Sequence, residues 1–251
     1  MTSSLTCTVV VPCYNEAARL DTEAFLEFIA QDRGISILFV NDASTDNTLT
    51  ILQQLQSRCS EKIRVLNKLK NGGKGEAVRD GMLEAIRLGG SQVVGFWDAD
   101  LATPLDAIPE LLGELEKNDH LEMVLGSRVR LLGRDVHRKA IRHYLGRVFA
   151  TVASILLSLH VYDTQCGAKL FRVTPQLEEI LATPFCSRWV FDVEILARYI
   201  VANKDHRDHL DTTIYEYPLR KWEDVAGSKV HPLDFVVAFG DLLRIYQRYL
   251  A

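Results

Sequence analysis

The chain has 251 residues, and 47% of them are hydrophobic, which suffices for one large α/β domain or two small ones around a core. Its formal net charge of −4 argues against a general nucleic-acid-binding protein, because such proteins carry an overall basic excess. The five cysteines are odd in number and form no Cys-x-x-Cys pair, so we expect a reducing compartment and no zinc or redox site.

Two features of the sequence bear on export and membrane crossing. Residues 1–6 lack the positive and apolar regions of a secretory signal, so we expect the chain to begin directly with its first strand. The longest nearly apolar stretch, 148–159, is shorter than the roughly 20 residues that a spanning helix needs. We therefore expect a cytoplasmic protein, either soluble or attached to a membrane surface without crossing it.

Five short runs rich in β-branched residues alternate with helical patterns, at 8–11, 35–40, 63–66, 93–97 and 123–125. This rhythm predicts an α/β fold with a mostly parallel central sheet and helices on its faces. Later in the chain the rhythm gives way to a basic stretch, a long helix, a glycine-containing loop and further helices. Because no repeat or linker divides the sequence, we predict a single domain spanning the whole chain.

Polar residues follow the second predicted strand, in the position where open parallel sheets bind ligands. Asp42 is suited to accept hydrogen bonds from a base or a ribose. Ser44, Thr45 and Asp46 are suited to cap the next helix, and capping is the favoured role for Asp46.

A glycine-rich turn, Asn71-Gly72-Gly73-Lys74-Gly75, leads from the third strand into the clearest predicted helix, whose apolar face extends to about residue 88. Backbone N–H groups, a helix N-terminus and a lysine together are suited to hold phosphate. The spacing does not fit a P-loop, because glycine rather than serine or threonine follows the lysine. A tight turn with an exposed lysine is the alternative interpretation.

The sharpest motif is Asp98-Ala99-Asp100, directly after the apolar strand at 93–97. Two carboxylates this close repel each other unless a cation lies between them, and their hard oxygen atoms suit Mg²⁺ or Mn²⁺ bridging a diphosphate. Such a metal neutralises charge on a departing nucleoside diphosphate. A helix N-cap carboxylate beside a surface acid is the alternative interpretation.

These three motifs and a fourth near the start of the chain occur in the order expected of family 2 glycosyltransferases with a GT-A fold, and the sequence resembles that family. The four are VPCYNE at 11–16, NDASTD at 41–46, GKGEAVRDG at 73–81 and DADLATP at 98–104. The resemblance continues through GSR at 126–128, DTQCGAKLF at 163–171, WVFDVE at 189–194 and WEDVAGSK at 222–229. Together these segments cover nearly the whole chain and look like the branch that transfers glucose to dolichyl phosphate.

The resemblance implies a UDP-glucose donor, a polyprenyl phosphate acceptor, and Mg²⁺ or Mn²⁺ held by Asp98 and Asp100. It implies a nucleotide-sugar-binding half over 1–125 and an acceptor-binding half over 126–251. The implied donor-binding residues are Pro12, Tyr14, Asn15, Glu16, Asp42, Lys74, Asp98 and Lys229. The implied acceptor-binding residues are Arg128, Arg138, Arg142, Gln165 and Lys169, and the implied catalytic residues are Asp98, Asp100, Arg128 and Asp192.

The sequence departs from the family pattern within the second motif. Asn41 stands where the family usually has the first Asp of Asp-Asp-Gly-Ser, and Ala43 replaces the glycine. Eukaryotic members of the branch also carry an N-terminal membrane anchor, which this sequence does not show. We therefore expect any membrane attachment to come from elsewhere in the chain.

Positive charge is concentrated at 128–147, where seven basic residues face a single acid, Asp135, which gives a net charge of 7 − 1 = +6. Apolar residues at helical spacing follow up to residue 159. Basic residues that lead into an apolar helix favour an interfacial helix on anionic lipid. A core helix with a solvated charged turn is the alternative, because periodicity alone does not separate the two.

The implied reaction is an inverting transfer, in which the acceptor attacks the anomeric carbon opposite the leaving diphosphate. A lipid phosphate is already ionised at neutral pH, so it needs positioning by cations such as Arg128 rather than a general base. Asp192 and Glu194 are candidates for a base, for sugar-hydroxyl ligands or for a structural role at a helix start. Lys229 resembles part of a loop that closes over the diphosphate, and an exposed loop lysine is the alternative.

Two other functions stay open at this point. A GT-A transferase that uses GDP-mannose or a soluble acceptor fits the same motifs. A non-catalytic nucleotide-sugar-binding protein is allowed by Asn41, although Lys74, Asp98 and Asp100 count against it. The sequence gives no indication of the oligomeric state.

Overall fold

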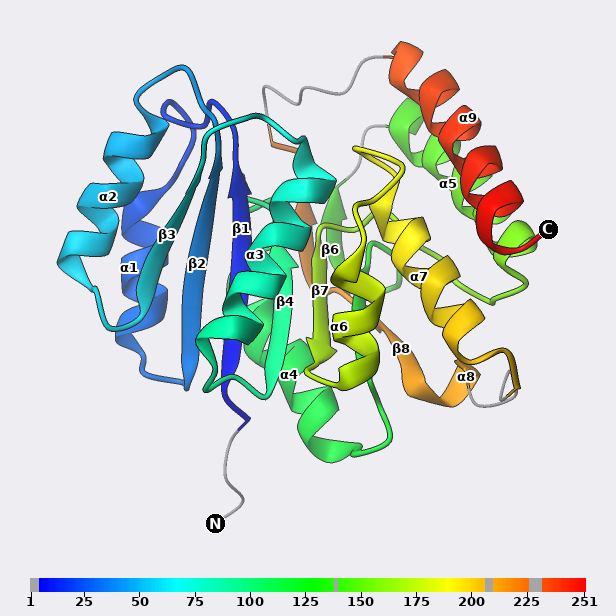
Figure 1. Ribbon diagram of the computed structural model, residues 1–251, viewed down its shortest axis with the longest axis horizontal. Coiled ribbons are helices and arrows are strands. Elements are labelled where there is room, and N and C mark those ends of the chain that lie inside the picture. Colours follow the sequence, from blue (N-terminus) through cyan, green and yellow to red (C-terminus); the bar gives the residue numbers. More distant parts are fainter. Residues whose placement is uncertain (1–4, 138–139, 206–209, 226–231) are drawn as a thin grey trace.

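The computed structural model describes residues 5–137, 140–205, 210–225 and 232–251, with the side chains of 137, 140–143 and 232–236 excepted. A seven-stranded sheet with the order β3-β2-β1-β4-β7-β5-β8 forms the centre of the molecule (Figure 1). Its strands are β1 (Cys7–Cys13), β2 (Ile35–Asp42), β3 (Ile63–Lys68), β4 (Val93–Trp97), β5 (Met123–Ser127), β7 (Ala168–Arg172) and β8 (Ile214–Pro218). Strand β7 is antiparallel to β4 and β5, and the other pairs are parallel.

Helices cover both faces of this sheet because each presents an apolar stripe to it. One face packs against α1 (Thr22–Ala30), α2 (Thr48–Arg58) and α4 (Ala107–Lys117). The other packs against α3 (Lys74–Leu88), α5 (Ala140–Leu157), α6 (Pro175–Ala182), α7 (Phe191–Ala202) and α9 (Pro232–Tyr249). A short helix, α8 (Leu210–Thr213), precedes β8, and β6 (Asp135–His137) pairs with β9 (Lys221–Glu223) in a separate two-stranded sheet.

The α/β prediction and all five predicted strands are confirmed, and most strands extend one to three residues beyond the predicted runs. Strands β7 and β8 were not predicted, although both carry apolar residues. Strand β7 comes from the second half of the chain and lies between β4 and β5 from the first half. The two halves therefore share one sheet.

The strand order places a binding crevice at one edge of the sheet. From β1 the chain proceeds to β2 and β3 on one side, then crosses to β4 on the other side of β1. In open α/β sheets such a reversal leaves a crevice beyond the carboxyl ends of the two strands. Because β7 is antiparallel, it contributes its amino end, and with it the 162–167 loop, to this same edge.

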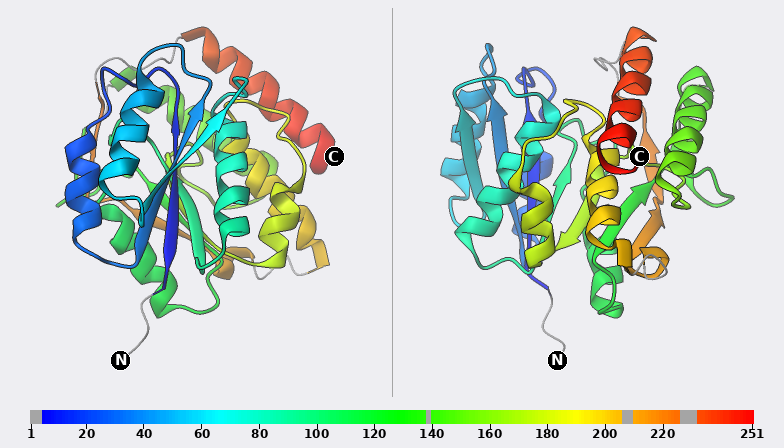
Figure 2. Two further views of the ribbon diagram at one scale, coloured as in Figure 1. Left: turned by 60° about the vertical axis from the view of Figure 1, so that its left-hand side comes forward. Right: turned by 45° about the vertical axis from the view of Figure 1, so that its right-hand side comes forward.

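Helices α5 and α9 lie side by side at one end of the molecule (Figures 1 and 2). The rings of Phe149 and Phe239 meet with their centroids 5.5 Å apart. On α5, Phe149, Ala153 and Leu157 are buried, whereas Tyr144 and Ile155 are 70% and 69% exposed. One side of this helix therefore belongs to the core and another presents apolar residues to solvent. The interfacial interpretation stays a prediction. Among the described residues, no helix is long and apolar enough to cross a membrane.

Candidate functional site

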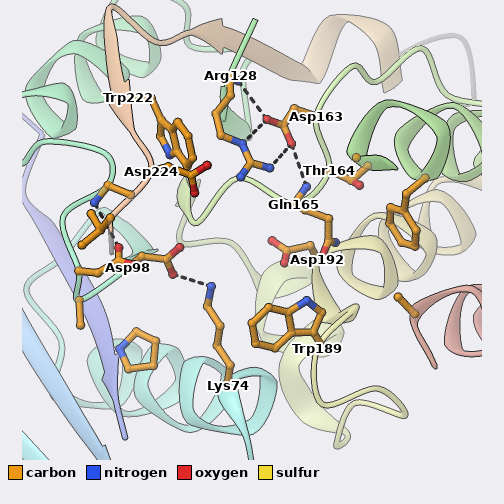
Figure 3. A pocket seen from close by; sticks show the side chains of 18 of the residues that line it. Lys74, Asp98, Arg128, Asp163, Thr164, Gln165, Trp189, Asp192, Trp222 and Asp224 are labelled. Atoms are coloured by element: carbon orange, nitrogen blue, oxygen red, sulfur yellow. Dashed lines mark hydrogen bonds and ion pairs between the residues drawn. The ribbon is translucent and has the colours of Figure 1, made fainter. Parts of the chain in front are cut away.

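A cavity of about 400 Å³ opens at this edge of the sheet and is lined by loops from both halves of the chain. The segments after β1, β2, β4 and β5 contribute to it, as do the starts of α3 and α7 and the 162–165 loop (Figure 3). Residues of α5, of α9 and of the β9 region complete the lining. The cavity lies at the carboxyl ends of the strands, where the sequence motifs predicted chemistry.

Asp98 and Asp100 both line the cavity directly after β4. The Asp98 backbone N–H donates to the Gly167 carbonyl at 3.0 Å, and Asp100 Oδ1 accepts from the Ala102 N–H at 3.2 Å. Burial, followed by the negative charge of Asp98, raises the pKa of Asp100. Two carboxylates held in mutual repulsion at a cavity wall form a donor set that suits a hard divalent cation. Within the described residues, no group of three or more His, Cys, Asp or Glu side chains is placed to hold a metal.

Lys74 extends from the first turn of α3 to Asp98 Oδ1, at 2.5 Å from its Nζ (Figure 3). Burial opposes the lysine charge, but the carboxylates of Asp98 and Asp192 together raise the pKa of Lys74. Gly73, with φ of 86°, adopts the left-handed region that turns the chain into the helix. The exposed-lysine alternative is wrong, since Lys74 lines the cavity and is only 25% exposed.

Asp42 lines the cavity, but its carboxylate accepts hydrogen bonds from the glycine-rich turn. Its two oxygens accept from the N–H groups of Gly72 at 2.9 Å and Gly73 at 2.8 Å, and Lys68 lies 3.1 Å away. This carboxylate therefore fixes the turn that begins α3. Asn41 points elsewhere, because its Nδ2 donates to Asn67 Oδ1 at 2.7 Å.

Of the predicted donor residues before β2, Pro12, Tyr14 and Glu16 line the cavity. Asn15 instead ties its loop to the neighbouring one, because its Oδ1 accepts from the Thr45 N–H at 2.8 Å. Ala43 has φ of 56°, in the left-handed region that favours glycine. That conformation gives a physical reason for the glycine that the family usually has there.

Arg128 lies in a bidentate ion pair that the sequence did not predict. Its Nε and Nη2 donate to the Asp163 carboxylate at 2.6 and 2.7 Å, and its backbone N–H donates to the same group at 3.0 Å. The Trp222 ring covers the guanidinium, and its centroid lies 5.4 Å from Arg128 Cζ. Although burial opposes the charge, Asp163 raises the pKa of Arg128 further. Glu216 in turn holds Asp163, accepting its backbone N–H at 2.8 Å.

Asp192 and Lys169 form a buried ion pair, with Lys169 Nζ 2.5 Å from Asp192 Oδ1. Asp192 lines the cavity from the first turn of α7, whereas Lys169 is 1% exposed and lies outside the lining. Burial raises the pKa of Asp192, and the positive charges of Lys169 and Lys74 oppose that rise. Glu194 is fully buried, and it accepts hydrogen bonds from Arg198 and Tyr249.

Several lining residues were not among the predicted site residues, although most lie in the quoted motifs. They include Asp163 and Thr164 beside Gln165, Trp189 before Asp192, Trp222 and Asp224 at β9, and Arg147 and Phe149 on α5. Motif position was the available signal for those named here, except Arg147 and Phe149. Arg138, Lys229 and the Arg142 side chain lie outside the described residues.

The site combines paired carboxylates, a lysine at a helix start and an arginine clamp at the switch point of a parallel sheet. Such a combination, at the carboxyl ends of parallel strands, is typical of the ligand-binding site of an α/β enzyme. A family model described as glycosyl transferase family 2 matches residues 8–176. The chain belongs to this family and is a glycosyltransferase.

The chain is similar to dolichyl-phosphate beta-glucosyltransferases over nearly its whole length. It is 34% identical to the protein of Dictyostelium discoideum, covering 96% of this chain and 74% of that one. It is 33% identical to the Drosophila melanogaster protein, covering 98% of this chain and 76% of that one. It is 32% identical to the Saccharomyces cerevisiae protein, covering 96% of this chain and 74% of that one.

Among solved structures, the chain resembles glucosyl-3-phosphoglycerate synthase from Mycobacterium tuberculosis. The complex of that enzyme with Mg²⁺ and uridine-diphosphate has a TM-score of 0.67 at 20% identity, covering 98% of this chain and 81% of that one. The complex with Mn²⁺, uridine-diphosphate-glucose and phosphoglyceric acid has a TM-score of 0.65 at 19% identity, with the same coverage. This likeness establishes the shared fold.

Proposed function

We propose that this glycosyltransferase moves glucose from UDP-glucose to a polyprenyl phosphate, with inversion at the anomeric carbon. The observation that carries the proposal is one cavity lined both by Lys74, Asp98 and Asp100 and by arginines beside the apolar residues of α5 and α9. The first group suits a nucleoside diphosphate, and the second suits a phosphate on a hydrocarbon chain. The names of the relatives support a glucosyl donor and a dolichyl phosphate acceptor.

On the donor side, the diphosphate lies against the start of α3. Lys74 supplies a positive charge, and the turn before it is fixed by Asp42. Pro12, Tyr14 and Glu16 line the wall for the nucleoside. Lys229, the other lysine predicted to bind the donor, lies outside the described residues.

Asp98 and Asp100 are the residues that would hold Mg²⁺ or Mn²⁺. The two carboxylates repel each other at a partly buried position, and burial together with the charge of Asp98 raises the pKa of Asp100. A divalent cation between them would relieve that repulsion. When bound, the metal supplies charge neutralisation for the departing diphosphate. Asp98 and Asp100 would supply two carboxylate ligands to that metal.

On the acceptor side, an ionised phosphate oxygen attacks the anomeric carbon while the bond from that carbon to the UDP oxygen breaks. No proton needs to be removed from such an acceptor, so positioning is the main requirement. Arg128 is held in place by Asp163 and Trp222, and Gln165 lines the same wall. Asp192 faces the cavity as a carboxylate flanked by two lysines, where it suits sugar hydroxyls.

The acceptor proposal extends to a peripheral position on the cytoplasmic face of a membrane. Helix α5 includes the last part of the basic 128–147 segment and packs against α9, and Tyr144, Val148 and Val237 on these two helices are each more than half exposed. An apolar face beside concentrated positive charge is typical of interfacial binding to anionic lipid. The cavity lining reaches these two helices through Phe149 and Ala238.

A matrix of donors and acceptors tests this function. UDP-glucose, UDP-galactose and GDP-mannose are each combined with polyprenyl phosphate, 3-phosphoglycerate or no acceptor, in Mg²⁺, Mn²⁺ or chelator. We expect metal-dependent transfer from UDP-glucose to the lipid alone, with a β-linked product. Transfer only from GDP-mannose, or only to the soluble acid, would replace the substrate assignment.

A further inference from the structure

The cations that line the cavity differ in how their charge is compensated. Arg19 pairs with Glu16 at 2.7 Å, Lys74 pairs with Asp98 at 2.5 Å, and Arg128 holds a bidentate pair with Asp163. Each of these side chains contributes a positive group whose charge is already matched by a carboxylate. An incoming phosphate monoester carries one to two negative charges, and these neutralised pairs attract it only weakly.

Arg147 is the exception among the described lining residues. This α5 side chain stacks on the Tyr162 ring, with the guanidinium carbon 3.6 Å from the ring centroid, and its Nη1 donates to the Tyr162 carbonyl at 3.4 Å. Within the part of the chain that the structure describes, no carboxylate lies within ion-pair distance of Arg147. Arg147 therefore brings to the cavity lining a positive charge that no described carboxylate balances.

Unused hydrogen-bond donors lie on the same wall. Thr164 Oγ1 and Gln165 Nε2 are both buried and have no hydrogen-bond partner within the described residues. Both residues line the cavity, two and three positions after Tyr162 (Figure 3). A buried hydroxyl or amide without a partner loses the hydrogen bond that it makes to water in the unfolded chain, so such groups indicate a ligand oxygen that satisfies them.

We propose that Arg147, together with Thr164 and Gln165, binds the terminal phosphate of the acceptor, while the Arg128–Asp163 pair acts as a neutral brace beside it. The inference rests on the proposed function and assigns its phosphate-binding residue. A guanidinium matches phosphate oxygens with two parallel N–H donors, and the Tyr162 ring keeps it from rotating away. The hydrocarbon chain then follows Phe149 and Ala150, which line the cavity two and three residues further along α5.

Kinetics with a short, water-soluble prenyl phosphate separate phosphate recognition from membrane binding. We expect Arg147→Gln to raise the acceptor KM at least tenfold while kcat and the Kd for UDP stay within about twofold of wild type. Arg147→Lys keeps the positive charge and should recover most of the affinity for the prenyl phosphate. Arg147→Met keeps only an apolar side chain of similar length and should not. Arg87→Gln, which removes an exposed arginine paired with Glu84, is the matched control and should behave as wild type.

A second arm uses inorganic phosphate as a competitor. It should inhibit the wild type competitively against the prenyl phosphate and lose at least tenfold in potency with Arg147→Gln. Thr164→Val should weaken the same inhibition by a smaller factor. A wild-type acceptor KM in Arg147→Gln, or equal impairment of the Lys, Met and Gln variants, overturns the inference. If the wild type transfers to no prenyl phosphate at all, the proposed function itself fails.

Discussion

Gly167 leaves room for the carboxylate of Asp98, because a β-carbon at Gly167 would lie 1.9 Å from Asp98 Oδ2. The two residues also share the hydrogen bond between the Asp98 N–H and the Gly167 carbonyl. The amino end of β7 therefore sets the direction in which the carboxylate leaves β4. We predict that Gly167→Ala displaces the Asp98 side chain and lowers kcat/KM at least a hundredfold.

The same variant should keep its fold, since a carboxylate that shifts at a cavity wall costs little packing. Gly113→Ala is the matched control, because a β-carbon there meets nothing within 4 Å. Gly113 lies inside α4, so alanine should stabilise the protein by about 0.5–1 kcal/mol and leave activity unchanged. Urea unfolding and steady-state kinetics on both variants check this, and a fully active Gly167→Ala would contradict the prediction.

Replacing Asp100 tests the metal assignment. Asp100→Asn keeps the size of the side chain and its hydrogen bond from Ala102 but removes one negative charge. We expect transfer to fall at least a thousandfold and the affinity for Mn²⁺ with UDP, measured by calorimetry, to fall at least tenfold. Transfer by the wild type that persists in chelator would show that the metal assignment is wrong.

Lys169→Met should destabilise the protein in a pH-dependent way. Burial raises the pKa of Asp192 above its unfolded value, and Lys169 limits that rise. A raised folded pKa gives stability that is complete below the unfolded pKa and is lost as pH rises through the folded one. Removing the lysine raises the folded pKa further, so the loss grows toward neutral pH, where breaking a buried pair costs about 3–5 kcal/mol.

Urea unfolding at pH 5 and pH 8 measures this difference. Lys117→Met, which removes a lysine that is 69% exposed, should cost under about 1 kcal/mol at both pH values. An equal loss at pH 5 and pH 8 for Lys169→Met would indicate lost packing rather than a lost counter-ion.

The thiols should differ in reactivity with a disulfide reagent. Burial raises the pKa of Cys7 to about 12 and that of Cys166 to about 11, and burial with Glu194 raises that of Cys186 to about 12. At pH 8 these groups are on the order of 0.1% thiolate or less. We expect rapid labelling of Cys59 alone in the native protein, abolished by Cys59→Ser, and of all five cysteines in guanidinium. Rapid labelling of Cys186 would contradict this.

The exposed apolar residues of α5 and α9 should carry vesicle binding. Ile155 and Leu243 are 69% and 52% exposed, so Ile155→Ser and Leu243→Ser remove apolar contacts from the surface without opening the core. We expect the wild type to sediment with anionic vesicles at low salt and less so at high salt, and the double variant to bind at least fivefold more weakly. Unchanged binding would reassign the membrane contact to other surfaces.

The sequence alone determined the α/β class, the five strands and the motifs at their ends, because alternation of apolar runs and the order of short polar motifs are local properties. This reasoning could find Asp98, Asp100 and Lys74, since each follows a strand or begins a helix whose pattern of apolar residues is clear in the sequence. Their contact, by contrast, depends on the order in which the strands pair.

Only the tertiary structure decided which residues each side chain of the site contacts. Strand β7 is short and lies far along the chain from β4, and only its antiparallel insertion brings Gly167 to Asp98 and the 162–165 loop to the cavity. The carboxylate that neutralises Arg128 is 35 residues away, and Lys169 is separated from Asp192 by α6. Charge compensation depends on distances of a few ångströms between side chains, and sequence spacing does not encode such distances. The sequence therefore identified Arg128 as a cation, and the fold showed that Asp163 already neutralises it while Arg147 has no such partner among the described residues.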